Sequence, residues 1–169
     1  QIMIKRQMRS MVARLAGLEC WNVNAGSGAG SGVALDFGKK LLRPNLVANQ
    51  HISEKSRQYV GEYALFIQNC AWRLETERKV LCSWRSSNLD GEEMLEGLAH
   101  RVDKKIESAF IENAALDLTL RFQSRFILRL FSDCLNTDDD GDNYSVFGPK
   151  TVLSVGGFGH IRSEFRSVA

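Results

Sequence analysis

Alternation of apolar and polar residues constrains this fold more than any other feature, because it recurs in four separate stretches. Apolar side chains occupy every second position in residues 70–74, 80–84, 118–122 and 126–130. Such alternation places one set of side chains on a single face of a strand. Short polar segments separate the first two stretches and the last two, which predicts two antiparallel hairpins.

Helical periodicity appears in two further segments. Residues 1–16 carry apolar side chains three and four positions apart, and Gly17 is placed to end this helix. Asp90 with Glu93 three residues later is typical of a capping box, which predicts a central helix over residues 90–102. We therefore expect one α+β domain over residues 1–169, with an antiparallel sheet, an N-terminal helix and a central helix. The apolar positions of the first helix are Ile4, Met8, Met11, Val12 and Leu15.

The remaining strands follow from shorter patterns. Gly38-Lys39 predicts a turn, and Ser53 predicts the cap of a short helical turn. After residue 155, the Gly156-Gly157-Phe158-Gly159 stretch and then a frayed basic tail are expected. Further strands are expected at residues 18–23, 33–37, 63–68, 105–111, 144–147 and 151–155.

Composition excludes several classes of protein. The 169 residues are 44% hydrophobic and 25% charged, which is typical of a soluble domain rather than a disordered chain. An apolar run of about 18 residues, which a membrane helix needs, does not occur. The four cysteines form no C-x-x-C pair, so we expect no structural zinc site. Without a signal-peptide pattern at the start, a reducing cytoplasm is the expected compartment.

Two pairs of segments resemble each other. Residues 33–37 share an L-x-F core with residues 117–122, and residues 62–66 resemble residues 143–147. One explanation is an internal duplication, with related units at 17–85 and 105–160 joined by the helix at 90–102. The other is that amphipathic strands resemble one another by composition alone. A duplication predicts a pseudo-two-fold arrangement whose sheets share one core.

The glycine-rich segment 24–32 invites comparison with phosphate-binding loops. A P-loop needs Lys after its last glycine, but Val33 follows Gly32 here. A dinucleotide fingerprint needs Gly or Ala at position 31, which is Ser31, and a helix afterwards. We interpret the segment as a hairpin connection. Its backbone N–H groups gripping a small anion remain the alternative.

An acidic segment follows at residues 136–143. It does not match an EF-hand, because Phe147 occupies the position of the bidentate glutamate. It is open whether the segment is a solvated turn, a weak cation site or a patch that steers a basic protein partner. We expect no metal and no cofactor, and we weigh the steering function most heavily. The four carboxylates concerned are Asp138, Asp139, Asp140 and Asp142.

Aromatic and reactive residues give a second candidate surface. Trp84 shares the alternation of a core strand, but Trp84-Arg85 also lies at a strand end, where such residues anchor interfaces. No nucleophile motif accompanies the three histidines, so we expect a binding protein and not an enzyme. The interleaved basic and aromatic pattern of an RNA-binding sheet does not occur. We therefore expect a protein partner, with no nucleic acid and no membrane.

Several motifs together carry a resemblance. They are Gly17-Leu18, Cys20-Trp21, Leu35-Asp36-Phe37-Gly38, Ala71-Trp72-Arg73-Leu74 and Asp139-Asp140-Gly141-Asp142-Asn143-Tyr144. This layout resembles small bacterial proteins that are similar to immunity proteins of contact-dependent growth inhibition and other toxin systems. The resemblance implies a cytoplasmic inhibitor that neutralises a cognate toxin domain by direct binding. A small ligand- or anion-binding domain, or an enzyme, that uses residues 24–32 is the alternative.

Overall fold

The fold comes from a computed structural model that describes the chain except residues 27–31, 101, 137–140 and 168–169. Its first helix, α1 (Ile2–Ala13), buries the expected apolar face and ends before Gly17, whose φ is +86°. A short helix, α2 (Glu54–Gln58), begins at Ser53, whose side-chain oxygen accepts a hydrogen bond from Ser56 N. The N-terminal helix and the cap at Ser53 are therefore confirmed, although the helix ends at Ala13 and not at residue 16.

The central helix is shorter than the sequence predicts. It is α3 (Glu93–Ala99), and Glu92 is its N-cap residue. The predicted cap at Asp90 is wrong because Gly91 has a φ of +76°, a left-handed conformation that separates Asp90 from the helix. The predicted extension to residue 102 is also wrong, because the last helical residue is Ala99.

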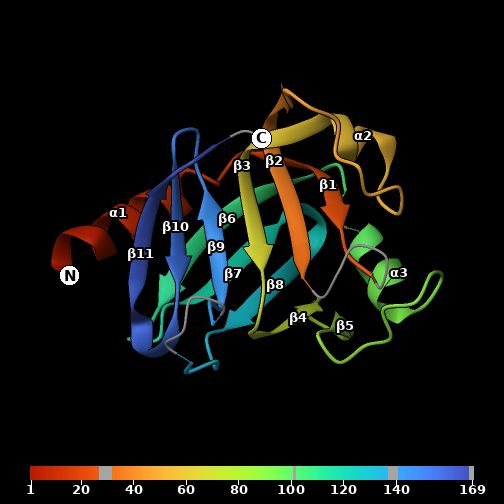
Figure 1. The fold of residues 1–169 in the computed structure, drawn as a ribbon. Helices are drawn as coiled ribbons and strands as arrows, with labels where there is room; N and C mark the ends of the chain where they lie inside the picture. The colour runs from red at the N-terminus through yellow and green to blue at the C-terminus, as the bar shows by residue number, and fades with distance from the viewer. Residues whose placement is uncertain (27–31, 101, 137–140, 168–169) are drawn as a thin grey trace.

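The strands form one antiparallel sheet in the order β11-β10-β9-β3-β2-β1-β6-β7-β8-β4-β5. This sheet folds over on itself: the strands from β11 to β1 make the front layer in Figure 1, and β6, β7 and β8 cross behind them. The α+β class with an antiparallel sheet is therefore confirmed. The bounds are β1 Glu19–Asn24, β2 Val33–Leu42, β3 Tyr59–Ile67, β4 Ala71–Glu75, β5 Val80–Ser83, β6 Lys104–Glu112, β7 Asp117–Phe122, β8 Phe126–Phe131, β9 Tyr144–Phe147, β10 Thr151–Val155 and β11 Ile161–Phe165.

The strand order has an internal two-fold relation centred on the β1–β6 pair. Exchanging β1 to β5 with β6 to β10 reproduces the same order, read from the other end. Each half supplies a three-stranded meander, β1-β2-β3 or β6-β7-β8. Each meander is extended by the hairpin of the other half, because β9-β10 lies beside β3 and β4-β5 lies beside β8. Among the strands described, β11 has no counterpart.

The strand register follows the same relation. The β1–β2 ladder has an irregularity after Cys20, opposite Phe37, and the β6–β7 ladder has one after Ile106, opposite Phe122. The resemblance of residues 33–37 to 117–122 thus joins the equivalent strands β2 and β7. The resemblance of residues 62–66 to residues 143–147 does not join equivalent strands. It relates β3 to β9, which pair with each other, whereas the counterpart of β3 is β8. That the two halves arose by duplication stays a prediction.

Two other expectations are corrected by the sheet. At Gly38-Lys39 there is no turn: β2 continues to Leu42, and Gly38, at φ +74°, lies where the β2–β3 register shifts. Glycine thus permits a bulge that bends a continuous strand. The expected frayed tail is also wrong, because residues 161–165 form β11 and pair along the whole length of β10.

A single apolar cluster lies between the two layers. It joins side chains from both halves of the chain, including Phe37, Leu65, Phe122, Leu128 and Tyr144. The helix α1 packs against β6 and β11, whereas α3 packs against β5, so the helices lie at opposite ends of the core. None of the helices in the described residues has the length and apolar character needed to cross a membrane.

A pH-dependent contribution to stability comes from Glu75 on β4. Burial by itself raises the pKa of this carboxyl, but hydrogen bonds from Arg129 and Arg73 outweigh it and hold the pKa below its usual value. A lowered pKa stabilises the fold above the usual pKa of Glu, and that contribution is lost as pH falls through the lowered pKa. We expect Glu75→Gln to destabilise the protein at pH 7 and to have a shrinking effect toward pH 3.

Denaturant unfolding of both proteins at several pH values measures this difference. Glu77→Gln is the matched control, because Glu77 is exposed and pairs with the exposed Arg125 at 3.2 Å. An exposed pair contributes little at any pH. A Glu75→Gln effect that stayed constant from pH 7 to pH 3 would contradict the prediction.

Candidate functional site

The turn between β10 and β11 holds an exposed aromatic side chain in an unusual backbone conformation. Phe158 has φ +56° and ψ 29°, and 75% of its surface is exposed. A positive φ is rare for a bulky residue and costs free energy unless the surrounding structure enforces it. Residues in such conformations are enriched at functional sites. Other residues of this chain, such as the buried Leu116, also have a positive φ, and it is the exposure of its large apolar side chain that sets Phe158 apart.

The neighbours of Phe158 explain why the turn adopts this shape. A Cβ at Gly157 would lie 2.7 Å from the carbonyl oxygen of Leu135, and one at Gly159 would lie 2.2 Å from that of Ala114. The turn therefore rests its backbone directly on two other loops. Of its three residues, Phe158 is the one whose side chain has space, and that space is on the solvent side.

The side chain of Asn143, the last residue of the acidic segment, links that segment to the turn. This side chain is fully buried and accepts a hydrogen bond from Cys134 N at 2.9 Å. The amide group also donates to the carbonyl oxygens of Cys134 and Gly156, at 3.0 and 3.2 Å. One side chain thus ties the start of residues 134–143 to the end of β10.

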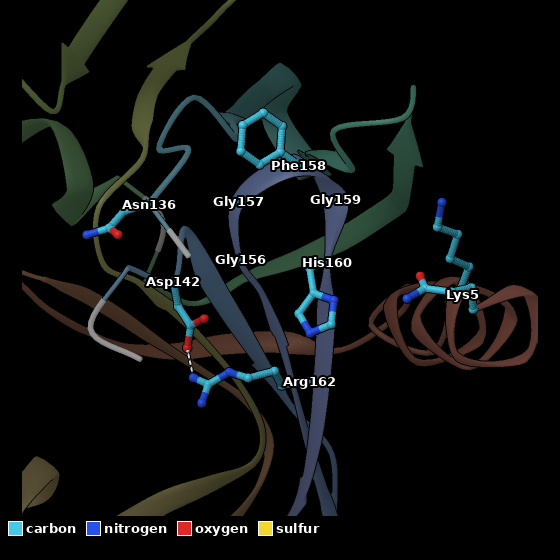
Figure 2. A pocket seen from close by; sticks show the side chains of 10 residues that line it. Lys5, Asn136, Asp142, Gly156, Gly157, Phe158, Gly159, His160 and Arg162 are labelled. Atoms are coloured by element: carbon cyan, nitrogen blue, oxygen red, sulfur yellow. Dashed lines mark hydrogen bonds and ion pairs between the residues drawn. The ribbon is translucent and has the colours of Figure 1, made fainter. Parts of the chain in front are cut away.

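A hollow of about 470 Å³ lies beside this turn. In Figure 2 the Arg162 and Asp142 side chains point toward each other, and Phe158 points away from that pair. His160 and Lys5, the latter from α1, also line the hollow. Arg162 of β11 therefore pairs with the buried Asp142 carboxylate, and Lys5 of α1 lines the same hollow.

The predicted acidic patch is only partly within the described residues. Asp138, Asp139 and Asp140 lie outside them. Asp142 does not project to solvent as a steering charge, because it is 6% exposed and accepts a hydrogen bond from Arg162. Asn136 and Asp142 both line the hollow, so the ends of the acidic segment meet there.

The second predicted group, Trp84 and Arg85, lies elsewhere. Trp84 is 47% exposed, unlike the buried Trp72, and the Arg85 guanidinium carbon lies 4.7 Å from the centre of its indole ring. The expectation of core burial is therefore wrong for Trp84. It lines a second hollow of about 490 Å³, together with Gly26 and Gly32 of the glycine-rich segment.

The two hollows are separate but adjoin one short connection. They have no lining residue in common, and Asn69, which lines the second, donates a hydrogen bond to the carbonyl oxygen of Asp142 at 3.0 Å. Asp142 and Trp84, one described residue from each predicted group, thus lie on either side of the β3–β4 connection. They do not form one surface patch.

Comparison with known proteins adds no assignment. No protein-family model, curated protein or solved structure matches this chain. The function of the site is therefore inferred from its geometry.

Reactive chemistry has little support from the side chains around these hollows. Burial, with a smaller effect of Asp133, raises the pKa of the Cys70 thiol to about 12, so this thiol stays protonated at neutral pH. In the part of the chain that the structure describes, no three His, Cys, Asp or Glu side chains group as metal ligands would. The exposed aromatic and charged groups are suited to binding.

Sequence reasoning missed the residues that define this site. The glycine stretch that holds Phe158 carries no predicted element or role, and Arg162 is not singled out by any sequence pattern. A signal for the turn was present, because Gly-Gly-Phe-Gly separates two apolar stretches, Val152–Val155 and the alternating residues from Ile161 onward. Glycines between two such stretches are typical of a hairpin.

Proposed function

We propose that this chain is a protein-binding inhibitor whose partner covers the Phe158 turn. The exposure of Phe158 on a strained, tightly supported backbone is the observation that carries the proposal. An aromatic side chain that enters a pocket of a partner supplies a large share of binding energy. Two glycines and their neighbours already hold the turn in one conformation. Binding therefore costs little further conformational entropy.

The partner we propose is a bacterial toxin domain, which makes the chain an immunity protein that blocks its toxin by direct contact. The charge around the turn supports a protein partner with both signs of charge. Lys5, Arg162 and Asp142 line the hollow beside the turn, and Asp138, Asp139 and Asp140 precede Asp142 in the sequence. Charges of this kind at the rim of an interface raise the association rate and make it depend on salt.

The first test uses the protein encoded by the neighbouring reading frame as the candidate partner. Phe158→Ala should weaken its binding by roughly 10- to 100-fold, as expected for an aromatic anchor. Titration calorimetry with the purified proteins gives the dissociation constant, and growth of cells that produce both proteins shows whether protection is lost.

Leu42→Ala is the matched control, because Leu42 is also an exposed apolar residue but lies at the end of β2, distant in sequence from the turn. Its binding should match that of the wild type. Tight binding that survives Phe158→Ala would contradict the proposed surface. No binding and no protection by the wild type would contradict the proposed inhibition of that partner.

A second candidate function is binding of a small neutral ligand in the hollow beside Trp84. The described side chains that line it carry no charge, and Gln68 Oε1 is buried there without a hydrogen-bond partner in the described residues. Such a site suits a flat molecule with an N–H donor, and it does not favour an anion. An increase in melting temperature with neutral heteroaromatic compounds, but not with phosphate or sulfate, would support this function.

A further inference from the structure

The outer edge of β11 is an unpaired strand edge at one end of the sheet. In the described structure β11 pairs with β10 on one side and with no strand on the other. Four of its five residues are exposed, and Phe165 is 94% exposed. At the opposite end of the sheet α3 packs against the edge strand β5, and at this end α1 contacts β11 but supplies no strand to pair with it. An open edge carries backbone groups that can pair with another strand.

The hydrogen bonds to β10 show which backbone groups of β11 face outward. Arg166 N donates to Lys150 O, and Gly156 N donates to His160 O. In an antiparallel ladder, hydrogen-bonded pairs alternate with pairs that are not hydrogen-bonded. Residues 162 and 164 therefore bond to β10. Ile161, Ser163 and Phe165 direct their N–H and C=O groups to the open edge.

The sequence of this edge is complementary to itself. When β11 pairs antiparallel with a second β11 about an axis at Ser163, Ile161 lies opposite Phe165 of the second copy. All the residues that face outward then form hydrogen-bonded pairs. Between them, Arg162, whose guanidinium also donates to Asp142 of its own chain, lies opposite Glu164 of the second copy. This is the type of pair whose side chains approach most closely.

Any other register loses this match. A shift of two residues along the strand keeps the hydrogen bonding but places Arg162 opposite Arg162, or Glu164 opposite Glu164, and like charges directly opposite destabilise a sheet. In a shift of one residue, the backbone N–H and C=O groups that face the open edge lie opposite residues whose own groups already bond to β10, so the ladder cannot form. The open edge thus favours a second copy of the same chain in one register.

We propose that this protein forms a two-fold dimer in which β11 pairs antiparallel with β11 of a second copy. The dimer joins the two sheets into one continuous sheet. It also places the exposed Phe165 opposite Ile161 of the second copy, whose own side chain is buried in the core. The strand that has no counterpart in the internal two-fold relation is then the strand that makes the interface.

The test is sedimentation equilibrium of the full chain over a wide range of concentrations. The wild type should show a monomer–dimer equilibrium. Ser163→Pro should raise the dissociation constant at least tenfold, because proline removes an outward N–H while the ladder to β10 keeps its own hydrogen bonds. Circular dichroism of the variant at low concentration checks that its monomer is folded. Glu164→Arg should also weaken the dimer, by placing Arg opposite Arg162 on both sides of the axis.

A cross-link tests the register. Ser163→Cys should give a covalent dimer under mild oxidation, since facing residues of a hydrogen-bonded pair have Cα atoms about 5.5 Å apart, within the range of disulfides. Glu164→Cys is the control and should not, because each 164 position faces 162 of the other copy. A wild type that remains monomeric at every concentration overturns the proposal. A dimer unaffected by Ser163→Pro, or one that cross-links at 164 and not at 163, also overturns it.

Discussion

Phe122→Ala and Phe37→Ala should each lower the free energy of unfolding by about 3–5 kcal/mol, the cost of removing a fully buried phenylalanine. Both rings are buried in the single core, and both lie opposite the register shift of a neighbouring strand. Because the two-fold relation of the strands places them in equivalent positions, their losses should be similar. Urea denaturation of both variants measures the two values.

Two exposed phenylalanines provide the control for this comparison. Phe158→Ala and Phe165→Ala remove the same number of atoms from sites that are mostly in solvent. Each should change stability by less than about 0.5 kcal/mol, measured where the protein is monomeric. If Phe37→Ala and Phe122→Ala differed by more than their combined error, the two halves would not be energetically equivalent.

Asn143→Ala should destabilise the protein by about 3 kcal/mol or more, because it leaves several buried polar groups unpaired. The groups affected are the N–H and C=O of Cys134 and the C=O of Gly156. Because these groups connect the acidic segment with the Phe158 turn, binding of the partner should weaken as well. Thermal unfolding measures the first effect, and calorimetry with the partner measures the second.

Asn49→Ala is the matched control, since Asn49 is exposed and its side chain accepts a hydrogen bond from His51 N in a surface loop. Its effect on stability should stay within about 0.5 kcal/mol. Should Asn143→Ala be equally mild, the hydrogen bonds of Asn143 would not be what holds the turn in place.

The sequence predicted local elements well and their arrangement only in part. Both alternating hairpins form as expected, because each strand and its turn are encoded within a few neighbouring residues. The position of β4 beside β8 was not predicted. Pairing of strands separated by more than 50 residues depends on how the whole core closes, and no short pattern records that choice.

Backbone conformation explains the clearest errors. The turn at residues 157–159 depends on a left-handed Phe158, and phenylalanine carries no preference for that conformation. β11 was therefore missed together with its turn. The central helix was overestimated for a related reason: a capping pattern at Asp90 was counted, but the left-handed Gly91 that follows it was not.

The candidate site shows where residue types alone mislead. Asp142 is grouped with its acidic neighbours because they are adjacent in sequence, whereas in the structure it is buried and paired with Arg162 of β11. Trp84 was assigned by alternation to the core, yet β5 ends at Ser83, so the alternation no longer fixes its direction. In both cases a contact distant in sequence, or the end of an element, decides the environment.

The exchange of hairpins between the two meanders has a consequence for how the molecule folds. Neither half of the chain can complete its own sheet, because the edge of each meander is covered by strands made much later or much earlier in the sequence. Closing such distant contacts costs chain entropy before they give stability, so folding should be slow for a protein of this length. A nascent N-terminal half would have to wait, with β3 uncovered, until synthesis reaches β9.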